Sequence, residues 1–300
     1  MTLMFSCVLC GGRKSRPFFK TRDARFRRCG ECGLVQMFPR PETIGEGEDY
    51  AGFDLDAYRD FMTEFRVPQY ERDTALIKAH RSGGRLLDVG CGTGEFLDVA
   101  EKSGFQPLGV EPSAKASAIA GARHRVIRGE FRDAALPERS FEVITLWSVL
   151  EHVLDPPAVL RRVRVLLMED GVVALRVPDV RGLLPKLALG LYKVTLGRIT
   201  VPLRVLYQLD WHYKHFYGFD RGTIVKLMDA HGFEILELRR EISYARRGLP
   251  LRMEYLPVRW RATRALARIS LSAVLPLAKL LRGEDEVVLV ARKKNEALHG

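Results

Sequence analysis

Hydrophobic and polar positions along residues 84–180 follow the rhythm of a sheet crossed by helices. Short apolar runs of strand length recur there, and the stretches between them repeat their apolar residues at helical spacing. The runs predict five strands, at 86–89, 107–110, 125–127, 141–146 and 172–177, with helices near 95–103, 113–120 and 157–168. Because helical crossovers join parallel strands, this pattern predicts a doubly wound α/β fold.

The chain beyond residue 180 adds further elements to this core. A helix over 221–231 and a strand over 233–238 continue the pattern, and a last strand over 286–291 is expected to enter antiparallel at the edge of the sheet. Residues 181–214 are leucine-rich and basic, and two prolines break them into short pieces. We interpret them as an insertion or a lid over the cleft.

Four of the five cysteines form two Cys-x-x-Cys pairs near the N-terminus. Cys7 pairs with Cys10 and Cys29 with Cys32, and the eighteen residues between the pairs fit a four-thiolate zinc site. Four thiolates complete the zinc tetrahedron and leave no position open for a substrate. The spacing therefore predicts a structural zinc ribbon, with two disulfides or four free thiols as the alternatives.

The segment between the two cysteine pairs is basic and carries three phenylalanines. Such a ribbon is typical of nucleic-acid binding, but the aromatic residues fit the small core of the ribbon better. We therefore interpret Phe18, Phe19 and Phe26 as core residues.

The net charge of +11 is concentrated outside the predicted sheet. Residues 84–180 hold twelve basic and fourteen acidic side chains, whereas 181–214 hold six against one and 239–282 hold eleven against two. This asymmetry favours an anionic partner, which is a phosphorylated substrate, an acidic lipid surface or nucleic acid. A basic surface that serves only solubility is the alternative.

The stretch LLDVGCGTGEF, residues 86–96, has the pattern of a strand, a glycine turn and a helix start. Gly90, Gly92 and Gly94 carry no Cβ atom, so a bulky ligand can approach the backbone and the free N–H groups of the helix. The dinucleotide fingerprint expects a glycine where this chain has Glu95, and a pyrophosphate would meet a carboxylate there. The turn favours an uncharged or cationic ligand and disfavours a nicotinamide oxidoreductase.

This turn, D-x-G-C-G-T-G, and the acid Glu111 roughly 20 residues after Gly90 together resemble the first motifs of class I S-adenosylmethionine-dependent methyltransferases. The resemblance implies a seven-stranded Rossmann-like sheet, with the turn beside the methionine part of the cofactor and Glu111 on the ribose hydroxyls. The cofactor-binding residues that it implies are Asp88, Gly90, Cys91, Gly92, Gly94, Phe96, Glu111, Pro112, Glu130, Phe131 and Trp147.

The run W-S-V-L-E-H-V-L-D-P after the fourth strand resembles a motif of one methyltransferase group. Glu142 departs from that group, which commonly has aspartate in F-D-x-I. The departure is expected to alter helix or loop contacts and not chemistry.

The later run W-H-Y-K-H-F-Y-G-F resembles the H-x-x-x-F segment of the family, which places His215 on the substrate side. Imidazole titrates near neutral pH, so we expect His152 or His215 to act as general base and Tyr217 to orient the acceptor. A core histidine bonded to backbone is the alternative for His215.

The zinc ribbon and these two histidine motifs together resemble a bacterial group of deoxysugar C-methyltransferases and enzymes of surface polysaccharide assembly. The resemblance implies methyl transfer to a small or lipid-linked, sugar-containing anionic substrate. An RNA-directed methyltransferase that docks through the ribbon and a non-catalytic cofactor-binding scaffold are the alternatives. Nucleic acid is the less favoured partner, because the chain lacks an N-P-P-Y or D-P-P-Y tetrapeptide.

The segments expected from these patterns also bear on location. No run reaches the roughly 18 uncharged apolar residues of a spanning helix, and the start of the chain lacks a signal-peptide pattern, so we expect a cytoplasmic protein. Membrane contact through the basic segments is an expectation too, with docking on the core or on a second subunit as the alternative. The predicted segments are a zinc ribbon (1–40), a linker and capping helix that ends near Ser82 (41–83), the S-adenosylmethionine-binding core (84–180), the lid or insertion (181–214), a core helix and strand (215–239), a basic amphipathic helical excursion (240–283) and a final edge strand with a tail (284–300).

Overall fold

The computed structural model of the chain describes residues 4–43, 59–60, 62–210, 213–242 and 284–294. The predicted basic amphipathic helix within 240–283 and most of the predicted linker after residue 43 lie outside the described residues.

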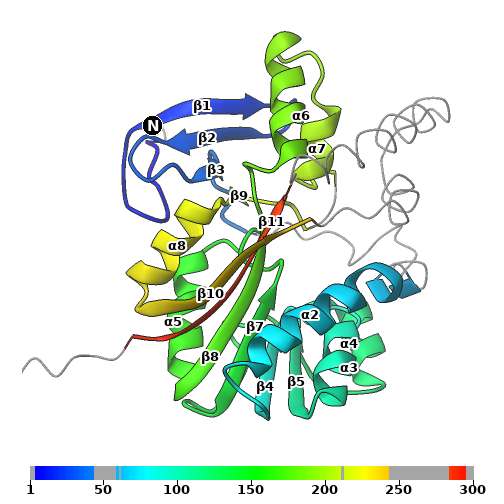
Figure 1. The fold of residues 1–300 in the computed structure, drawn as a ribbon. Helices are drawn as coiled ribbons and strands as arrows, with labels where there is room; N and C mark the ends of the chain where they lie inside the picture. Colours follow the sequence, from blue (N-terminus) through cyan, green and yellow to red (C-terminus); the bar gives the residue numbers. More distant parts are fainter. Residues whose placement is uncertain (1–3, 44–58, 61, 211–212, 243–283, 295–300) are drawn as a thin grey trace, which may run out of the picture.

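A seven-stranded sheet forms the centre of the molecule (Figure 1). Its order is β10-β11-β8-β7-β4-β5-β6, in which the five strands from β8 to β6 run parallel and β11 and β10 run antiparallel. The strands are β4 (Gly84–Val89), β5 (Phe105–Glu111), β6 (Arg125–Arg128), β7 (Phe141–Trp147), β8 (Leu167–Pro178), β10 (Phe233–Glu241) and β11 (Glu286–Lys293). All seven predicted strands and the doubly wound fold class are confirmed.

The prediction that the last strand lies at the edge of the sheet is wrong. Strand β11 lies between β8 and β10, and β10 forms the edge. The burial of the two strands explains the order. Almost every residue of β11 is buried, as in an interior strand, whereas β10 alternates apolar residues with half-exposed charged ones.

Helices cover both faces of this sheet (Figure 1). The apolar residues of α2 and α3 pack on one face, and those of α5 and α8 pack on the other. The helices are η1 (Met62–Arg66), α2 (Val67–Lys78), α3 (Glu95–Lys102), α4 (Ala114–Gly121), α5 (Pro156–Leu166) and α8 (Arg221–Ala230). Helix α2 ends at Lys78, a few residues before the predicted end near Ser82, because the chain needs that length to turn into β4 at Gly84.

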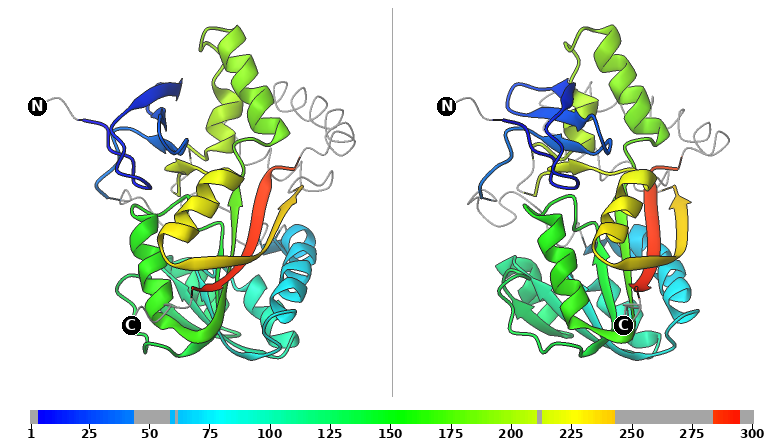
Figure 2. Two further views of the ribbon diagram at one scale, coloured as in Figure 1. Left: turned by 60° about the vertical axis from the view of Figure 1, so that its left-hand side comes forward. Right: turned by 90° about the vertical axis from the view of Figure 1, so that its left-hand side faces the viewer.

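A second, small antiparallel sheet lies beside one end of the central one (Figure 2). Its order is β1-β2-β3-β9, and its strands are β1 (Ser15–Lys20), β2 (Arg25–Cys29), β3 (Val35–Met37) and β9 (Tyr217–Gly218). Strand β9 comes from the segment predicted to belong to the core, and it pairs Gly218 with Val35 and Tyr217 with Gln36. The N-terminal ribbon is therefore joined to the core through a shared sheet.

Within the segment that we interpret as an insertion or a lid, α6 (Leu183–Val194) and α7 (Val201–Leu206) form a helical hairpin. Its buried side chains pack on the ribbon, in a cluster that includes Phe19 and Phe26 from the ribbon and Ala188 and Leu203 from the hairpin. Phe19 and Phe26 are buried core residues, as predicted, whereas Phe18 is half-buried against them, and the core is shared with the hairpin. Across the described part of the chain, no helix is both long and apolar enough to cross a bilayer.

A buried ion network ties α2 to the central sheet. Arg176 of β8 is 1% exposed, and its guanidinium donates to Asp73 of α2 over 2.6 Å and to Glu241 of β10 over 3.2 Å. It also donates to Glu286 of β11, which pairs with Arg66 at the start of α2. Removing two arginines and three acids from water is costly unless they satisfy one another, so this network fixes α2 in one position over the sheet.

Candidate active site

The glycine turn follows β4 and enters α3. Gly90, Gly92 and Gly94 have φ values of 72°, 55° and 92°, in the left-handed region that glycine adopts at least cost. A Cβ atom added to Gly90 would lie 3.0 Å from Cγ2 of Val149, whereas one added to Gly92 would meet no atom of the described residues within 4 Å. The turn is thus closed on one side by the loop after β7 and open at Gly92, where a ligand has room.

Glu111 lies at the carboxyl end of β5 and faces this turn. Its side chain accepts a hydrogen bond from the N–H of Gly92 over 2.8 Å and another from the N–H of Ser113 over 2.9 Å. The acid predicted to hold the ribose therefore sits beside the open side of the turn.

Two further acids are buried around the turn. Asp88 accepts a hydrogen bond from the Thr145 hydroxyl over 2.7 Å, and burial raises the pKa of Asp88 to about 8. Glu95 accepts from the Thr93 hydroxyl, and burial raises the pKa of its carboxyl as well. Asp88 joins β4 to β7 beneath the turn, and Glu95 occupies the position where a dinucleotide fold would have glycine.

Aromatic side chains line the region between the turn and α2. Phe96 of α3 meets Trp147 edge to face, with ring centroids 5.1 Å apart, and Tyr70 of α2 meets Phe96 at 5.3 Å. The indole N–H of Trp147 is buried and lacks a hydrogen-bond partner among the described residues. Trp147 therefore offers a donor at the carboxyl end of β7.

The other predicted cofactor residues lie around the same strand ends. The Cys91 thiol packs toward β5, because a Cβ atom added to Gly109 would lie 2.5 Å from its sulfur. Glu130 is exposed after β6, and the buried Phe131 lies under the guanidinium of Arg162. The contacts of these residues, and that of Pro112, with a cofactor stay predictions.

Both predicted histidines meet at the carboxyl end of β7, together with an acid that the sequence analysis left out. Ligand atoms of Glu151, His152 and His215 all lie within 4.8 Å of one another. Glu151 is 1% exposed, and neither of its carboxyl oxygens has a hydrogen-bond partner among the described residues. The position of Glu151 next to His152 in sequence was the available signal.

Burial sets the protonation of this acid–imidazole cluster. It raises the pKa of Glu151 to about 8 and lowers that of His152 to about 4, and the pKa of His215 also lies well below its usual value. At neutral pH both imidazoles are uncharged and Glu151 holds a proton. The Nδ1 of His152 faces the Lys214 carbonyl at 3.1 Å, which can only accept, so in the neutral ring Nδ1 carries the proton and Nε2 does not.

Backbone contacts hold the two histidine segments together. Phe216 donates its N–H to the Glu151 carbonyl over 2.7 Å, and the Tyr217 hydroxyl donates to the Leu154 carbonyl over 2.8 Å. His215 donates its N–H to the Tyr207 carbonyl at the end of the hairpin. In the structure Tyr217 thus anchors the loop after β7, and its role toward an acceptor stays a prediction.

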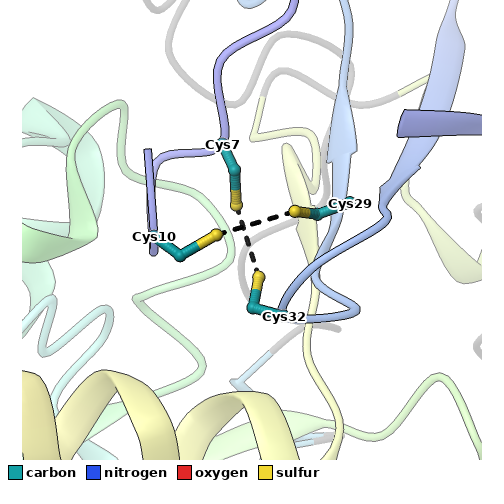
Figure 3. Close-up of side chains that lie close together, drawn as sticks. All are labelled: Cys7, Cys10, Cys29 and Cys32. Atoms are coloured by element: carbon teal, nitrogen blue, oxygen red, sulfur yellow. Dashed lines mark hydrogen bonds between the residues drawn. The ribbon is translucent and has the colours of Figure 1, made fainter. Parts of the chain in front are cut away.

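The four N-terminal thiols also converge (Figure 3). The sulfur atoms of Cys7 and Cys32 are 3.4 Å apart and those of Cys10 and Cys29 are 3.6 Å apart, with all four within 4.8 Å. A disulfide would need about 2.05 Å. Zn–S bonds of about 2.3 Å place the sulfurs of a tetrahedron about 3.8 Å apart, so the cluster is compatible with zinc and argues against the disulfide alternative.

The donor set of the acid–imidazole cluster also belongs to the classes that ligate divalent metal ions. The two clusters differ in their surroundings. The thiols belong to the N-terminal ribbon, whereas His152 lies in the loop after β7, which packs against the glycine turn through Val149, and His215 lies in the segment before β9.

Comparison with known proteins agrees with this geometry. A family model described as a methyltransferase domain matches residues 62–238. The ubiquinone biosynthesis O-methyltransferase of Rhodopseudomonas palustris (strain BisB5) is 30% identical over 118 residues, which cover 37% of this chain and 46% of that protein. The one of Bradyrhizobium sp. (strain ORS 278) is 34% identical, over 34% of this chain and 46% of that protein. The chain thus matches less than half the length of these curated relatives.

Solved structures share the fold. A SAM-dependent methyltransferase from Archaeoglobus fulgidus matches with a TM-score of 0.51 at 16% identity. The match covers 79% of this chain and 99% of that protein. Phosphoethanolamine N-methyltransferase 2 of Haemonchus contortus, in complex with phosphomonomethylethanolamine and S-adenosylhomocysteine, has a TM-score of 0.56 at 16% identity over 87% of this chain and 62% of its own. At these identities the likeness supports the architecture alone.

Proposed function

Because the chain belongs to the methyltransferase domain family, we propose that it transfers a methyl group from S-adenosylmethionine to a small or lipid-linked acceptor that carries a sugar and negative charge. The family makes the chain an S-adenosylmethionine-dependent methyltransferase, and the acceptor class is our proposal. The observation that carries the proposed transfer site is the cluster of Glu151, His152 and His215, in and around the loop that packs on the glycine turn.

The residues at the turn fit the cofactor. Gly92 leaves space over the backbone among the described residues, the carboxylate of Glu111 lies beside it, and Phe96 and Trp147 supply an apolar wall. When bound, S-adenosylmethionine supplies an electrophilic methyl group on a sulfonium. The protein holds the acceptor in line with that methyl and removes water from the site.

The acid–imidazole cluster handles the proton. Nε2 of His152 has no proton at neutral pH and can accept the one that the acceptor oxygen or carbon releases as it bonds to the methyl. The electron pair of the broken C–S bond stays on sulfur, so the sulfonium charge is lost and a proton is left on the imidazole. His215 meets His152 edge to face and fixes its ring, and Glu151, protonated and buried, is a donor toward the cluster or the acceptor.

We also propose that the four cysteines hold a structural zinc ion. The two cysteine pairs flank β1 and β2 of the small sheet. That sheet also contains β9, whose segment carries His215 and Tyr217. The ion would stabilise the ribbon, and through β9 it would fix the position of the histidine segment.

The sugar and the anionic character rest on two supports. The ribbon and both histidine motifs resemble a group that includes deoxysugar C-methyltransferases and enzymes of surface polysaccharide assembly. The positive charge of the chain lies in the segments outside the central sheet. An anionic nucleotide sugar or lipid-linked sugar matches both.

A methylation screen tests the acceptor. The full chain is incubated with S-adenosylmethionine and with nucleotide sugars, extracted lipid-linked sugars, phenolic quinone precursors or RNA, and formation of S-adenosylhomocysteine is measured. Turnover with a sugar acceptor supports the proposal. Turnover with RNA and a steep salt dependence of its binding would overturn it in favour of the RNA-directed alternative, and cofactor binding without turnover on any acceptor would favour the scaffold.

A further inference from the structure

The α6–α7 hairpin carries most of the exposed apolar surface of the described chain. Nine large hydrophobic residues are exposed in the described chain, and seven of them belong to the hairpin. Val194 and Leu196 at its tip are 84% and 88% exposed. The seven are Leu187, Leu191, Val194, Leu196, Ile199, Val201 and Val205. Single exposed apolar residues are ordinary, but a contiguous group marks an interaction surface.

Helical spacing places three of these residues on one side of α6. Leu187, Leu191 and Val194 follow one another at intervals of four and three, so they form one stripe along α6. The flank of α6 next to this stripe is already used, because Ala188 and, on α7, Leu203 are buried against the ribbon. Figure 1 shows α6 standing away from the central sheet, which leaves its outer stripe uncovered by the described core.

The hairpin is held firmly from the ribbon side. The Tyr192 hydroxyl accepts a hydrogen bond from the N–H of Lys20 over 3.1 Å. Arg204 pairs with Asp23 of the ribbon and with Asp210. The apolar stripe is therefore presented by an ordered element.

The charged side chains around the stripe are all basic. Residues 180–209 contain no Asp or Glu, and the exposed Lys186, Lys193 and Arg198 have no ion-pair partner among the described residues. Aliphatic side chains flanked by basic ones are the pattern of a helix that lies on an anionic bilayer. Two copies of this chain joined through the same patch would instead bring like charges together.

We propose that the α6–α7 hairpin docks the protein on an anionic lipid surface. The twelve residues of α6 are about 18 Å long, well short of a hydrocarbon core of about 30 Å, so the helix would lie in the interface and not cross it. The apolar residues enter the boundary of the acyl chains and the three basic residues meet the lipid phosphates. This contact is independent of methyl transfer, although it would bring a lipid-linked acceptor to the side of the molecule that carries His215.

Vesicle co-sedimentation of the full chain tests the proposal. We expect binding to vesicles of equimolar phosphatidylcholine and phosphatidylglycerol, much weaker binding to pure phosphatidylcholine, and weaker binding in high salt. The double variant Leu191→Glu with Val194→Glu should lose at least about tenfold in binding, whereas Val165→Glu, an exposed apolar position on α5, should bind like the parent. Replacing Lys186, Lys193 and Arg198 by glutamate, which reverses their charge, should weaken binding to anionic vesicles. The same change at the exposed Lys102, Arg125 and Arg132 should weaken it less.

A gain-of-signal measurement guards against misfolded variants. Tryptophan fluorescence of Leu196→Trp should shift to shorter wavelength with anionic vesicles, and that of Val165→Trp should not. Equal binding to neutral and anionic vesicles, or full binding by the hairpin variants, would overturn the proposal, and the latter would move the contact to a segment such as 243–283. Self-association that the hairpin variants abolish, without vesicle binding by the parent, would assign the patch to a second copy and overturn it as well.

Discussion

His152 and His215 meet edge to face with ring centroids 4.7 Å apart, although they come from different segments of the chain. His152 belongs to the loop after β7, and His215 precedes β9, which pairs with the N-terminal ribbon. The candidate base therefore depends on three parts of the molecule, which are the central sheet, the ribbon and the end of the hairpin.

The pH profile of kcat/KM should report the buried cluster. Burial lowers the pKa of His152 to about 4, so the base is unprotonated well below the usual range of histidine and no acid limb is expected near 6.5. Burial raises the pKa of Glu151 to about 8, so its proton is lost above that pH and kcat/KM should fall there. Glu151→Gln keeps a donor and should remove the alkaline limb, and an alkaline limb unchanged in this variant would show that Glu151 is not its source.

The open side of the glycine turn can be tested with a pair of alanine substitutions. Gly92 and Gly104 have positive φ values, and no atom of the described chain lies within 4 Å of an added Cβ, so either substitution should cost about 1 kcal/mol of stability from backbone strain. Only Gly92→Ala places a methyl group where we position the cofactor, and it should weaken S-adenosylmethionine binding at least about tenfold by calorimetry. Equal affinity in both variants would place the cofactor elsewhere.

The buried ion network should dominate the stability of the region around α2. Arg176→Met leaves Asp73, Glu241 and Glu286 without their shared cation, and we expect a loss of at least about 3 kcal/mol in the free energy of unfolding in urea. The matched change Arg132→Met breaks an exposed pair with Asp133 and should cost less than about 1 kcal/mol. Similar losses in the two variants would mean that the network is not a stabilising unit.

Metal analysis separates the two candidate metal sites. We expect one zinc per chain, held by the ribbon, and Cys29→Ser should lose it and lower the thermal midpoint. His152→Ala should keep the full zinc content. A second equivalent of metal that survives Cys29→Ser and disappears in His152→Ala would make the cluster of Glu151, His152 and His215 a metal site and the imidazoles ligands.

The elements of the central sheet could be predicted because their apolar runs are long and periodic. The glycine turn, Glu111 and His152 could be placed for a related reason. The turn and Glu111 directly follow predicted strands, His152 lies in the loop after another, and the carboxyl ends of parallel strands meet at one edge. Strand β9 could not be predicted, because its two residues carry no periodic signal and its partner β3 lies far away in sequence.

The pairing of Arg176 was equally invisible in the sequence. Arg176 stands within an apolar strand, and its partners Asp73 and Glu286 lie 103 and 110 residues away in sequence. Glu151 was missed for a different reason. An acid beside a histidine on a loop is usually solvated, but here the His215 segment bonds to the Glu151 backbone, and the carboxyl is buried with no hydrogen-bond partner in the part of the chain that the structure describes.

The most direct test of the account measures cofactor binding and turnover separately in the two histidine variants. His152→Ala and His215→Ala should bind S-adenosylmethionine with nearly unchanged affinity, while turnover with an acceptor found in the screen falls by about a hundredfold or more in at least one of them. The control His80→Ala, at an exposed position after α2, should retain both properties. Unchanged turnover in both variants would contradict the assignment of the acid–imidazole cluster as the site of proton removal.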